Sequence, residues 1–229
     1  MEKNLGSKAE KPLKKTPKIT KIWIWAIIFI FFFVANWIWG LFRTPCCFKP
    51  IEIIDSNEIS QYLSNVILPQ FYNKSQIPEP FEVVFTQEGI IDIVSRHIKT
   101  DDMKKWGLSD ISITFLSGRI LLTGKTKYKG RDFFVTAVFK PDANEKGMKA
   151  GLSKIKVGTR RIPFGVKLLR NRILYEIAGK SRGDDIVHYA GVLLNDDKTP
   201  AEFSFNHRDI KIKNISVEEQ QIRITFLPE

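Results

Sequence analysis

A cluster of basic side chains is the feature of this 229-residue sequence best suited to binding a ligand. Eleven Lys and Arg residues and a single acid, Glu176, lie between Lys146 and Arg182, so this segment carries +10. The chain carries +11 and residues 1–21 carry +5, so residues 22–229 outside the segment sum to −4. The positive field is therefore local, which suits anionic lipid headgroups or an acidic envelope polymer. We expect this contact to be made by Arg160, Arg161, Lys167, Arg170 and Arg172.

The alternative interpretation of the basic cluster is a solvated helix face. The stretch RIPFGVKLLRNRILYEIAGK, residues 161–180, has apolar residues at helical spacing, and Pro163 suits the first turn of a helix. Lys and Arg on the other side of such a helix would then only keep the domain soluble. The sequence leaves both interpretations open.

Patterns that carry catalysis or metal binding are not found in the sequence. GRILLTGKT, from Gly118 to Thr126, resembles a phosphate-binding loop but has five residues between its glycines where the motif has four. The three histidines are far apart, and none shares i, i+4 spacing with another ligand type. The paired aspartates at 101–102, 184–185 and 196–197 suit surface turns. We therefore predict a protein that is not an enzyme and uses no metal or cofactor.

A long apolar stretch near the N-terminus, Ile22 to Phe42, predicts a transmembrane helix. It contains no charged residue, and Asn36 is its one polar side chain. As a helix it spans roughly 31 Å, about the thickness of the hydrocarbon core of a bilayer. Four tryptophans lie near its ends, where indole rings prefer the headgroup level: Trp23, Trp25, Trp37 and Trp39.

The flanks of this stretch favour a retained anchor with its N-terminus in the cytoplasm. A cleaved signal has a shorter apolar region, of about 7 to 15 residues, and a site with small residues, which WGLFRTPCC does not offer. Seven lysines precede the span, so the positive-inside rule places residues 1–21 in the cytoplasm and the main domain outside it. The Lys-rich tail, residues 1–21, is predicted to be disordered. The expected location is the cell membrane, as a single-pass protein.

A juxtamembrane segment, residues 43–80, follows the span. Its two cysteines, Cys46 and Cys47, are adjacent and are the only two in the chain. A cysteine next to a membrane can be acylated, and the alternative is a pair of unmodified thiols. Asp55 and Glu58 have capping-box spacing, which predicts a helix over residues 55–68 that Pro69 ends.

The main domain, residues 81–229, is predicted to be α+β, an antiparallel sheet covered by a few helices. Residues 81–85 suit a short strand, and Thr86 suits the N-cap of a helix that buries Ile90, Ile91, Val94 and Ile98. Beyond Trp106 apolar residues alternate in DISITFLSGRILLTGKTKY, which predicts a hairpin that turns at Ser117 and Gly118. FFVTAVFK is apolar on both faces and predicts a central strand, and MKAGLSKIKV predicts a fourth strand. Alternation around residues 210–226 predicts a C-terminal hairpin.

The order of these segments resembles the YpmS-like membrane-anchored family of unknown function. The stretches that carry the resemblance are VVFTQEGIIDIVSRHI, ISITFLSGRILLTGK and KIKVGTRRIPFGVKLL, the last with a G-x-x-x-[IL]-P element from Gly158 to Pro163. The resemblance covers roughly residues 81–229. The family is in turn similar to tubular lipid-binding envelope proteins, in which a curved antiparallel sheet wraps a helix around an apolar groove. The resemblance thus implies a curved sheet and lipid handling.

From the sequence we expect a non-catalytic extracytoplasmic protein that binds a lipid or a lipid-linked glycan of the cell envelope. The alternative is a structural or scaffolding subunit of an envelope assembly. Nucleic acid is not an expected partner, because the domain lies outside the cytoplasm and aromatic residues are not interleaved with the basic cluster. No sequence feature identifies a protein partner.

Overall fold

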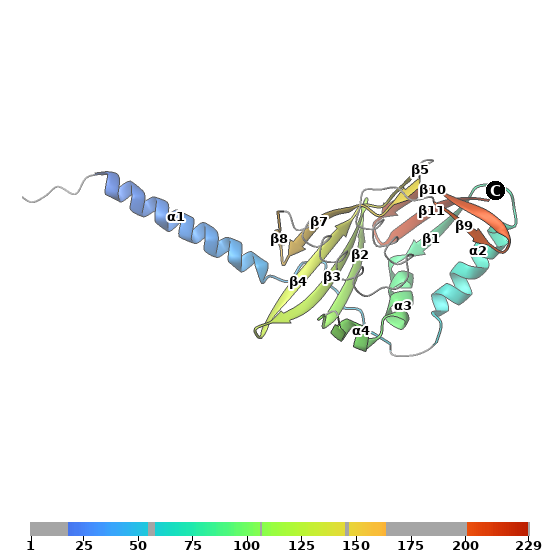
Figure 1. Ribbon diagram of the computed structural model, residues 1–229, viewed down its shortest axis with the longest axis horizontal. Coiled ribbons are helices and arrows are strands. Elements are labelled where there is room, and N and C mark those ends of the chain that lie inside the picture. The colour runs from blue at the N-terminus through green and yellow to red at the C-terminus, as the bar shows by residue number, and fades with distance from the viewer. Residues whose placement is uncertain (1–17, 55–57, 106, 145–146, 164–200, 229) are drawn as a thin grey trace, which may run out of the picture. The chain divides into compact units, whose positions relative to one another are not determined.

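The computed structural model describes residues 18–54, 58–105, 107–144, 147–163 and 201–228 (Figure 1). The chain divides into two compact units, Met1–Trp39 and Gly40–Glu229. Helix α1, Lys18–Leu41, makes up the described part of the first unit and contributes its last two residues to the second. The second unit is a mostly antiparallel sheet domain with few helices, which confirms the α+β class.

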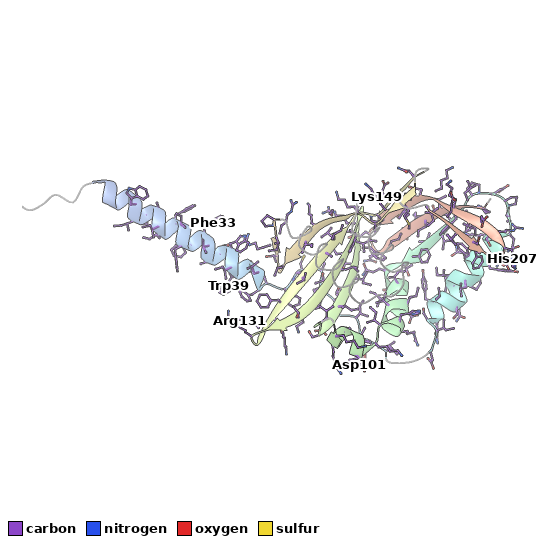
Figure 2. All side chains as sticks on the ribbon, in the orientation of Figure 1. Phe33, Trp39, Asp101, Arg131, Lys149 and His207 are labelled. Atoms are coloured by element: carbon purple, nitrogen blue, oxygen red, sulfur yellow. The ribbon has the colours of Figure 1, made fainter. Side chains whose placement is uncertain are left out.

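Helix α1 begins with a turn that contains the charged residues Lys18 and Lys21 and is apolar over the rest of its length, apart from Asn36. Residues Trp23–Leu41 are long and apolar enough to cross a membrane, a property that a signal sequence near an N-terminus also has. Its large side chains, such as Phe33 and Trp39, project outward and are each 66% exposed (Figure 2). A helix buried in a protein core would hide such residues. Phe42, expected within the span, lies one residue beyond the helix.

The helix predicted over residues 55–68 begins and ends later. Helical residues start at Gln61 and continue through a π-helical turn, η1 (Leu63–Ile67), into α2 (Leu68–Ser75). The prediction that Pro69 ends the helix was wrong. In the π-helical turn Leu68 N–H bonds to Leu63 O, five residues back. This wider turn leaves room for the proline ring, which would clash with a carbonyl in a regular α-helix.

Side chains cap the N-termini of two domain helices. Ser60 Oγ accepts a hydrogen bond from Leu63 N at 3.1 Å, whereas the predicted cap, Asp55, lies outside the described residues. Strand β1, Phe81–Thr86, leads into α3, Gln87–His97. The predicted cap Thr86 is confirmed, because its Oγ1 accepts from Gly89 N at 3.1 Å. A short helix, α4, Thr100–Lys105, follows.

In the described part of the chain, five strands form the larger sheet, in the order β2-β3-β4-β7-β8. The predicted hairpin is confirmed as β2, Asp110–Leu116, and β3, Arg119–Tyr128. Strand β4, Arg131–Phe139, lies centrally, as its apolar pattern predicted. The expected fourth strand is broken at Gly151, whose φ of +54° separates β6 from β7. The remaining bounds are Leu152–Val157 for β7, Arg160–Arg161 for β8, and Asp142–Asn144 and Gly147–Lys149 for the separate β5–β6 pair.

The C-terminal hairpin belongs to a second sheet, in the order β1-β11-β10-β9. Its strands are β9, Glu202–Phe205, β10, Arg208–Glu218, and β11, Gln221–Pro228. The expectation of one sheet is therefore corrected. β1 pairs with β11, from Phe81 opposite Phe226 to Thr86 opposite Gln221. Most of the domain sequence separates these two strands, and no local pattern predicts so distant a partner.

Among the described residues, two apolar clusters hold the η1–α2 helix and α3 against the sheets. In the first, the Phe71 ring of α2 lies 5.4 Å from the ring of Phe81 and 5.0 Å from that of Phe226. In the second, the α3 side chains Ile90, Ile91 and Val94 pack beside β2 and the β10–β11 hairpin. These three belong to the face that the sequence predicted.

Candidate functional site

One face of the larger sheet is apolar across four strands. Ile113 of β2 pairs with Leu122 of β3, Leu122 with Ala137 of β4, and Ala137 with Ile155 of β7. Residues directly opposite one another in antiparallel strands point to the same face. The flanking rows on this face are also apolar: Phe115, Ile120, Phe139 and Leu152 on one side, and Ile111, Gly124, Val135 and Val157 on the other.

The cover over this apolar face changes from strand to strand. On β2, Ile113 and Phe115 are only 9% and 2% exposed, because α3 and the β10–β11 hairpin pack on them. On β3, Leu122 is 40% exposed although its strand has a neighbour on each side. Ile155, at the far end of the same row, is 5% exposed. Leu122 is therefore exposed although Ile113 and Ile155 in the same row are buried, and we call this exposed position the Leu122 opening.

The structure separates two of the predicted basic contacts. Arg160 pairs with Val157 and so ends one of the apolar rows, whereas Arg161 pairs with Lys156 on the other face. Adjacent strand residues point to opposite faces, so the two arginines cannot contact one ligand on the apolar face. The other three predicted contacts, Lys167, Arg170 and Arg172, lie outside the described residues.

The turn between β7 and β8 contacts the final residues of α1 that belong to the second unit. Thr159 N and Thr159 Oγ1 both donate to Gly40 O, at 3.0 and 3.1 Å. The last carbonyls of a helix have no partner within the helix, and Thr159 supplies donors from 119 residues away. Gly158 has a φ of +57°, and a Cβ there would lie 2.4 Å from Gly40 O and 2.5 Å from Leu41 O. This close approach requires a glycine at position 158.

The start of β4 completes this junction. The Phe133 ring lies 4.8 Å from the Phe42 ring, and the Arg131 guanidinium lies 5.4 Å from the Phe42 ring centre. Such a guanidinium position favours a cation–π contact. We call residues 40–42, with residues 131, 133 and 158–160, the anchor junction. Arg160 of the apolar face therefore lies beside the residues at which α1 ends.

The opposite, more polar face of the sheet is crossed by residues that follow the anchor junction. Lys49 N donates to Ser112 Oγ at 3.1 Å, and Thr114 Oγ1 donates to Cys47 O at 3.1 Å. The Phe48 ring packs edge-on against Phe134 at 4.9 Å. The first part of the predicted juxtamembrane segment is thus bound to the main domain and is not a free linker.

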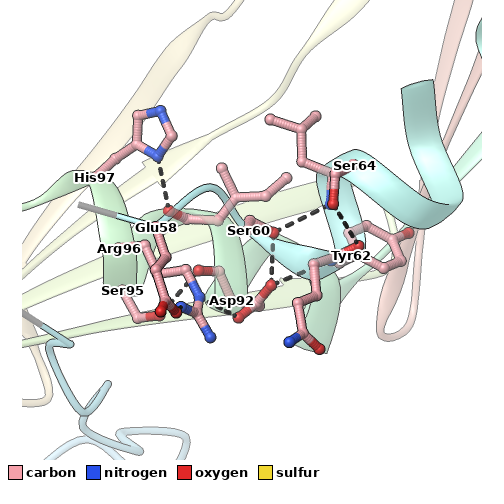
Figure 3. A network of polar contacts seen from close by, with 11 residues as sticks. Glu58, Ser60, Tyr62, Ser64, Asp92, Ser95, Arg96 and His97 are labelled. Atoms are coloured by element: carbon pink, nitrogen blue, oxygen red, sulfur yellow. Dashed lines mark hydrogen bonds and ion pairs between the residues drawn. The ribbon is translucent and has the colours of Figure 1, made fainter. Parts of the chain in front are cut away.

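A polar network joins the start of the helix at Gln61 to α3 (Figure 3). Asp92 accepts hydrogen bonds from Ser60 Oγ at 2.5 Å, from Tyr62 N at 3.3 Å and from Arg96 Nε at 3.0 Å. The hydrogen bond from Ser60, followed by that from Arg96, lowers the pKa of Asp92. A carboxylate with a lowered pKa is a weak base and is therefore poorly suited to accept a proton in catalysis. We assign this network to structure, as a clamp between two helices.

No group of three or more His, Cys, Asp and Glu side chains is placed to hold a metal ion in the described part of the chain. The four tryptophans predicted at the membrane interface all lie on α1, and the least exposed, Trp37, is still 39% exposed.

Comparison with known proteins adds no relative. No protein-family model, no curated protein and no solved structure matches the chain. The likeness to the YpmS-like family therefore rests on the sequence pattern alone.

Proposed function

We propose that this chain is a single-pass membrane protein whose main domain binds a lipid or a lipid-linked glycan without converting it. In this proposal α1 is retained as the anchor, the N-terminus is cytoplasmic and the domain works on the extracytoplasmic surface of the cell envelope. The observation that carries the proposal is the Leu122 opening, on an apolar sheet face that also carries Arg160 beside the end of the anchor.

The chemistry of this face matches the two parts of an anionic lipid. Burying an acyl chain contributes about 0.8 kcal/mol per methylene, and the apolar rows around Leu122 provide the surface for it. Arg160, whose side chain packs against Gly40, adds a positive charge at the end of one such row, which would attract a phosphate or carboxylate headgroup. A curved sheet of the kind that the family resemblance implies would deepen this surface.

The anchor junction supports retention of α1. Gly40 accepts two hydrogen bonds from Thr159, and Phe42 packs on Phe133 within the domain. Cleavage beside these residues would remove partners that the β7–β8 turn uses. A signal sequence that is discarded has no need of such contacts.

A scaffolding role is the second candidate, and a different surface favours it. Several apolar side chains of the η1–α2 helix are exposed: Val66 by 47%, Leu68 by 44% and Tyr72 by 49%. Exposed apolar surface of this kind is typical of contacts with another protein. In that case the Leu122 opening would bind no lipid.

Photolabelling with a lipid tests the proposal. The full chain, purified in detergent micelles, is illuminated with a phosphatidylglycerol that carries a diazirine in its acyl chain, and labelled peptides are identified by mass spectrometry. We expect label on β3, β4 and β7, and loss of that label in Leu122→Gln. Phe203→Gln is the matched control, because Phe203 is also 40% exposed but lies on the smaller sheet. Label confined to α1 would contradict the proposal.

A further inference from the structure

The two adjacent cysteines have a geometry that their sequence does not reveal. Cys46 and Cys47 lie in a turn that is closed by a hydrogen bond from Phe48 N to Pro45 O at 3.1 Å. Their Sγ atoms are 3.4 Å apart, and both thiols are free. Cys46 is exposed and Cys47 is half-buried, so a small reagent can reach the pair from solvent.

Contacts to the larger sheet hold this turn in place. Thr114 Oγ1 donates to the Cys47 carbonyl at 3.1 Å, and the Phe48 ring packs against Phe134. One residue further on, Lys49 N donates to Ser112 Oγ at 3.1 Å. The backbone on the C-terminal side of the two cysteines is therefore fixed, which limits how far the sulfurs can move apart.

We infer that Cys46 and Cys47 form a vicinal dithiol site that binds a soft, thiophilic centre through both sulfurs. This inference is independent of the proposed lipid function. Soft centres prefer thiolate ligands. With metal–sulfur bonds of about 2.3 Å, sulfurs 3.4 Å apart subtend an angle of about 95° at the centre. This angle fits a pyramidal centre such as trivalent arsenic, and it excludes a linear one.

The electrostatics of the pair favour a shared centre over two separate thiolates. The hydrogen bond with Cys46 raises the pKa of Cys47, and burial and the charge of Cys46 raise it further, against the opposing effect of Lys156. Two thiolates at this separation repel each other, and a centre bonded to both removes the repulsion.

Phenylarsine oxide is the probe that tests this inference. It reacts with two thiols to form two As–S bonds; the As–O bond breaks, and the oxygen leaves as water with both thiol protons. The oxidation state of arsenic does not change. We expect the reduced full chain in detergent to bind one phenylarsenic group, as measured by intact mass spectrometry. This adduct should survive treatment with a monothiol and should be removed by a dithiol.

Two comparisons make the result specific to the fold. Cys46→Ser and Cys47→Ser should each lose the monothiol-resistant adduct; an adduct of equal stability in either variant would overturn the inference. A synthetic peptide of residues 43–50 contains both thiols without the sheet contacts. Because the fold holds the sulfurs together, the full chain should bind the probe about tenfold more tightly than the peptide. Equal affinity, or no adduct in the full chain, would also overturn it.

Discussion

Gly158→Ala tests whether the β7–β8 turn is packed against the end of α1 as closely as the anchor junction requires. The substituted residue must keep a φ of +57°, which costs an L-residue roughly 1–2 kcal/mol. Its Cβ would also lie 2.4 Å from Gly40 O and 2.5 Å from Leu41 O, which are backbone atoms that cannot rotate away. The turn must therefore retreat and weaken the two hydrogen bonds of Thr159, each worth about 0.5–1.5 kcal/mol. The expected loss in the free energy of unfolding is about 2–5 kcal/mol.

Gly118→Ala separates the two contributions. Gly118 has a similar φ of +68°, but no atom lies within 4 Å of its would-be Cβ. Its substitution should therefore cost only the backbone strain, roughly 1–2 kcal/mol. The assay is urea unfolding of the full chain in detergent micelles, followed by far-ultraviolet circular dichroism. Equal losses in the two variants would refute the close approach at residue 158.

Three further predictions concern the helix clamp and the topology. Ser60→Ala should lower the free energy of unfolding by about 1–3 kcal/mol in the urea assay, because Ser60 is fully buried and its hydroxyl hydrogen-bonds both Leu63 N and Asp92. Ser64→Ala is the control and should change the free energy of unfolding by less than about 0.5 kcal/mol. The lowered pKa of Asp92 contributes stability that is present above its unfolded pKa of about 3.9 and is lost as the pH falls through the lower folded value. Asp92→Asn should therefore lose less stability than wild type on acidification, and parallel pH profiles would contradict this. A reporter that works only outside the cytoplasm should be active when fused after Glu229. Activity of a cytoplasm-only reporter at that position would contradict the proposed orientation.

Local patterns in the sequence predicted the elements of the fold well. Thr86 at the end of an extended stretch identified the start of α3, and alternation around Ser117 and Gly118 identified the β2–β3 hairpin. The π-helical turn before Pro69 was not predictable from the rule that proline ends a helix, because that rule assumes a regular α-helix upstream. The pairing of β1 with β11 and the division into two sheets were missed because both depend on contacts that are distant in sequence.

The site was predicted less completely than the fold. Basic composition drew attention to Arg160 and Arg161 together, but strand alternation puts them on opposite faces. One signal could have separated them: if the short stretch after Gly158 is taken as a strand, its successive side chains alternate between the two faces of the sheet. Thr159 and Gly40 were not singled out, because their contact joins residues 119 positions apart. The Leu122 opening could not be predicted, because exposure on a central strand depends on what packs above it.

Native mass spectrometry of the full chain released from detergent micelles tests the central claim most directly. The comparison is between the wild type and Leu122→Trp, in which the larger side chain fills the opening. Lipid held around α1 should be the same in both proteins, so the difference between them reports the domain. The account predicts a bound lipid in the wild type that is lost from Leu122→Trp. A lipid-free wild type, or the same bound lipid in both proteins, would contradict it.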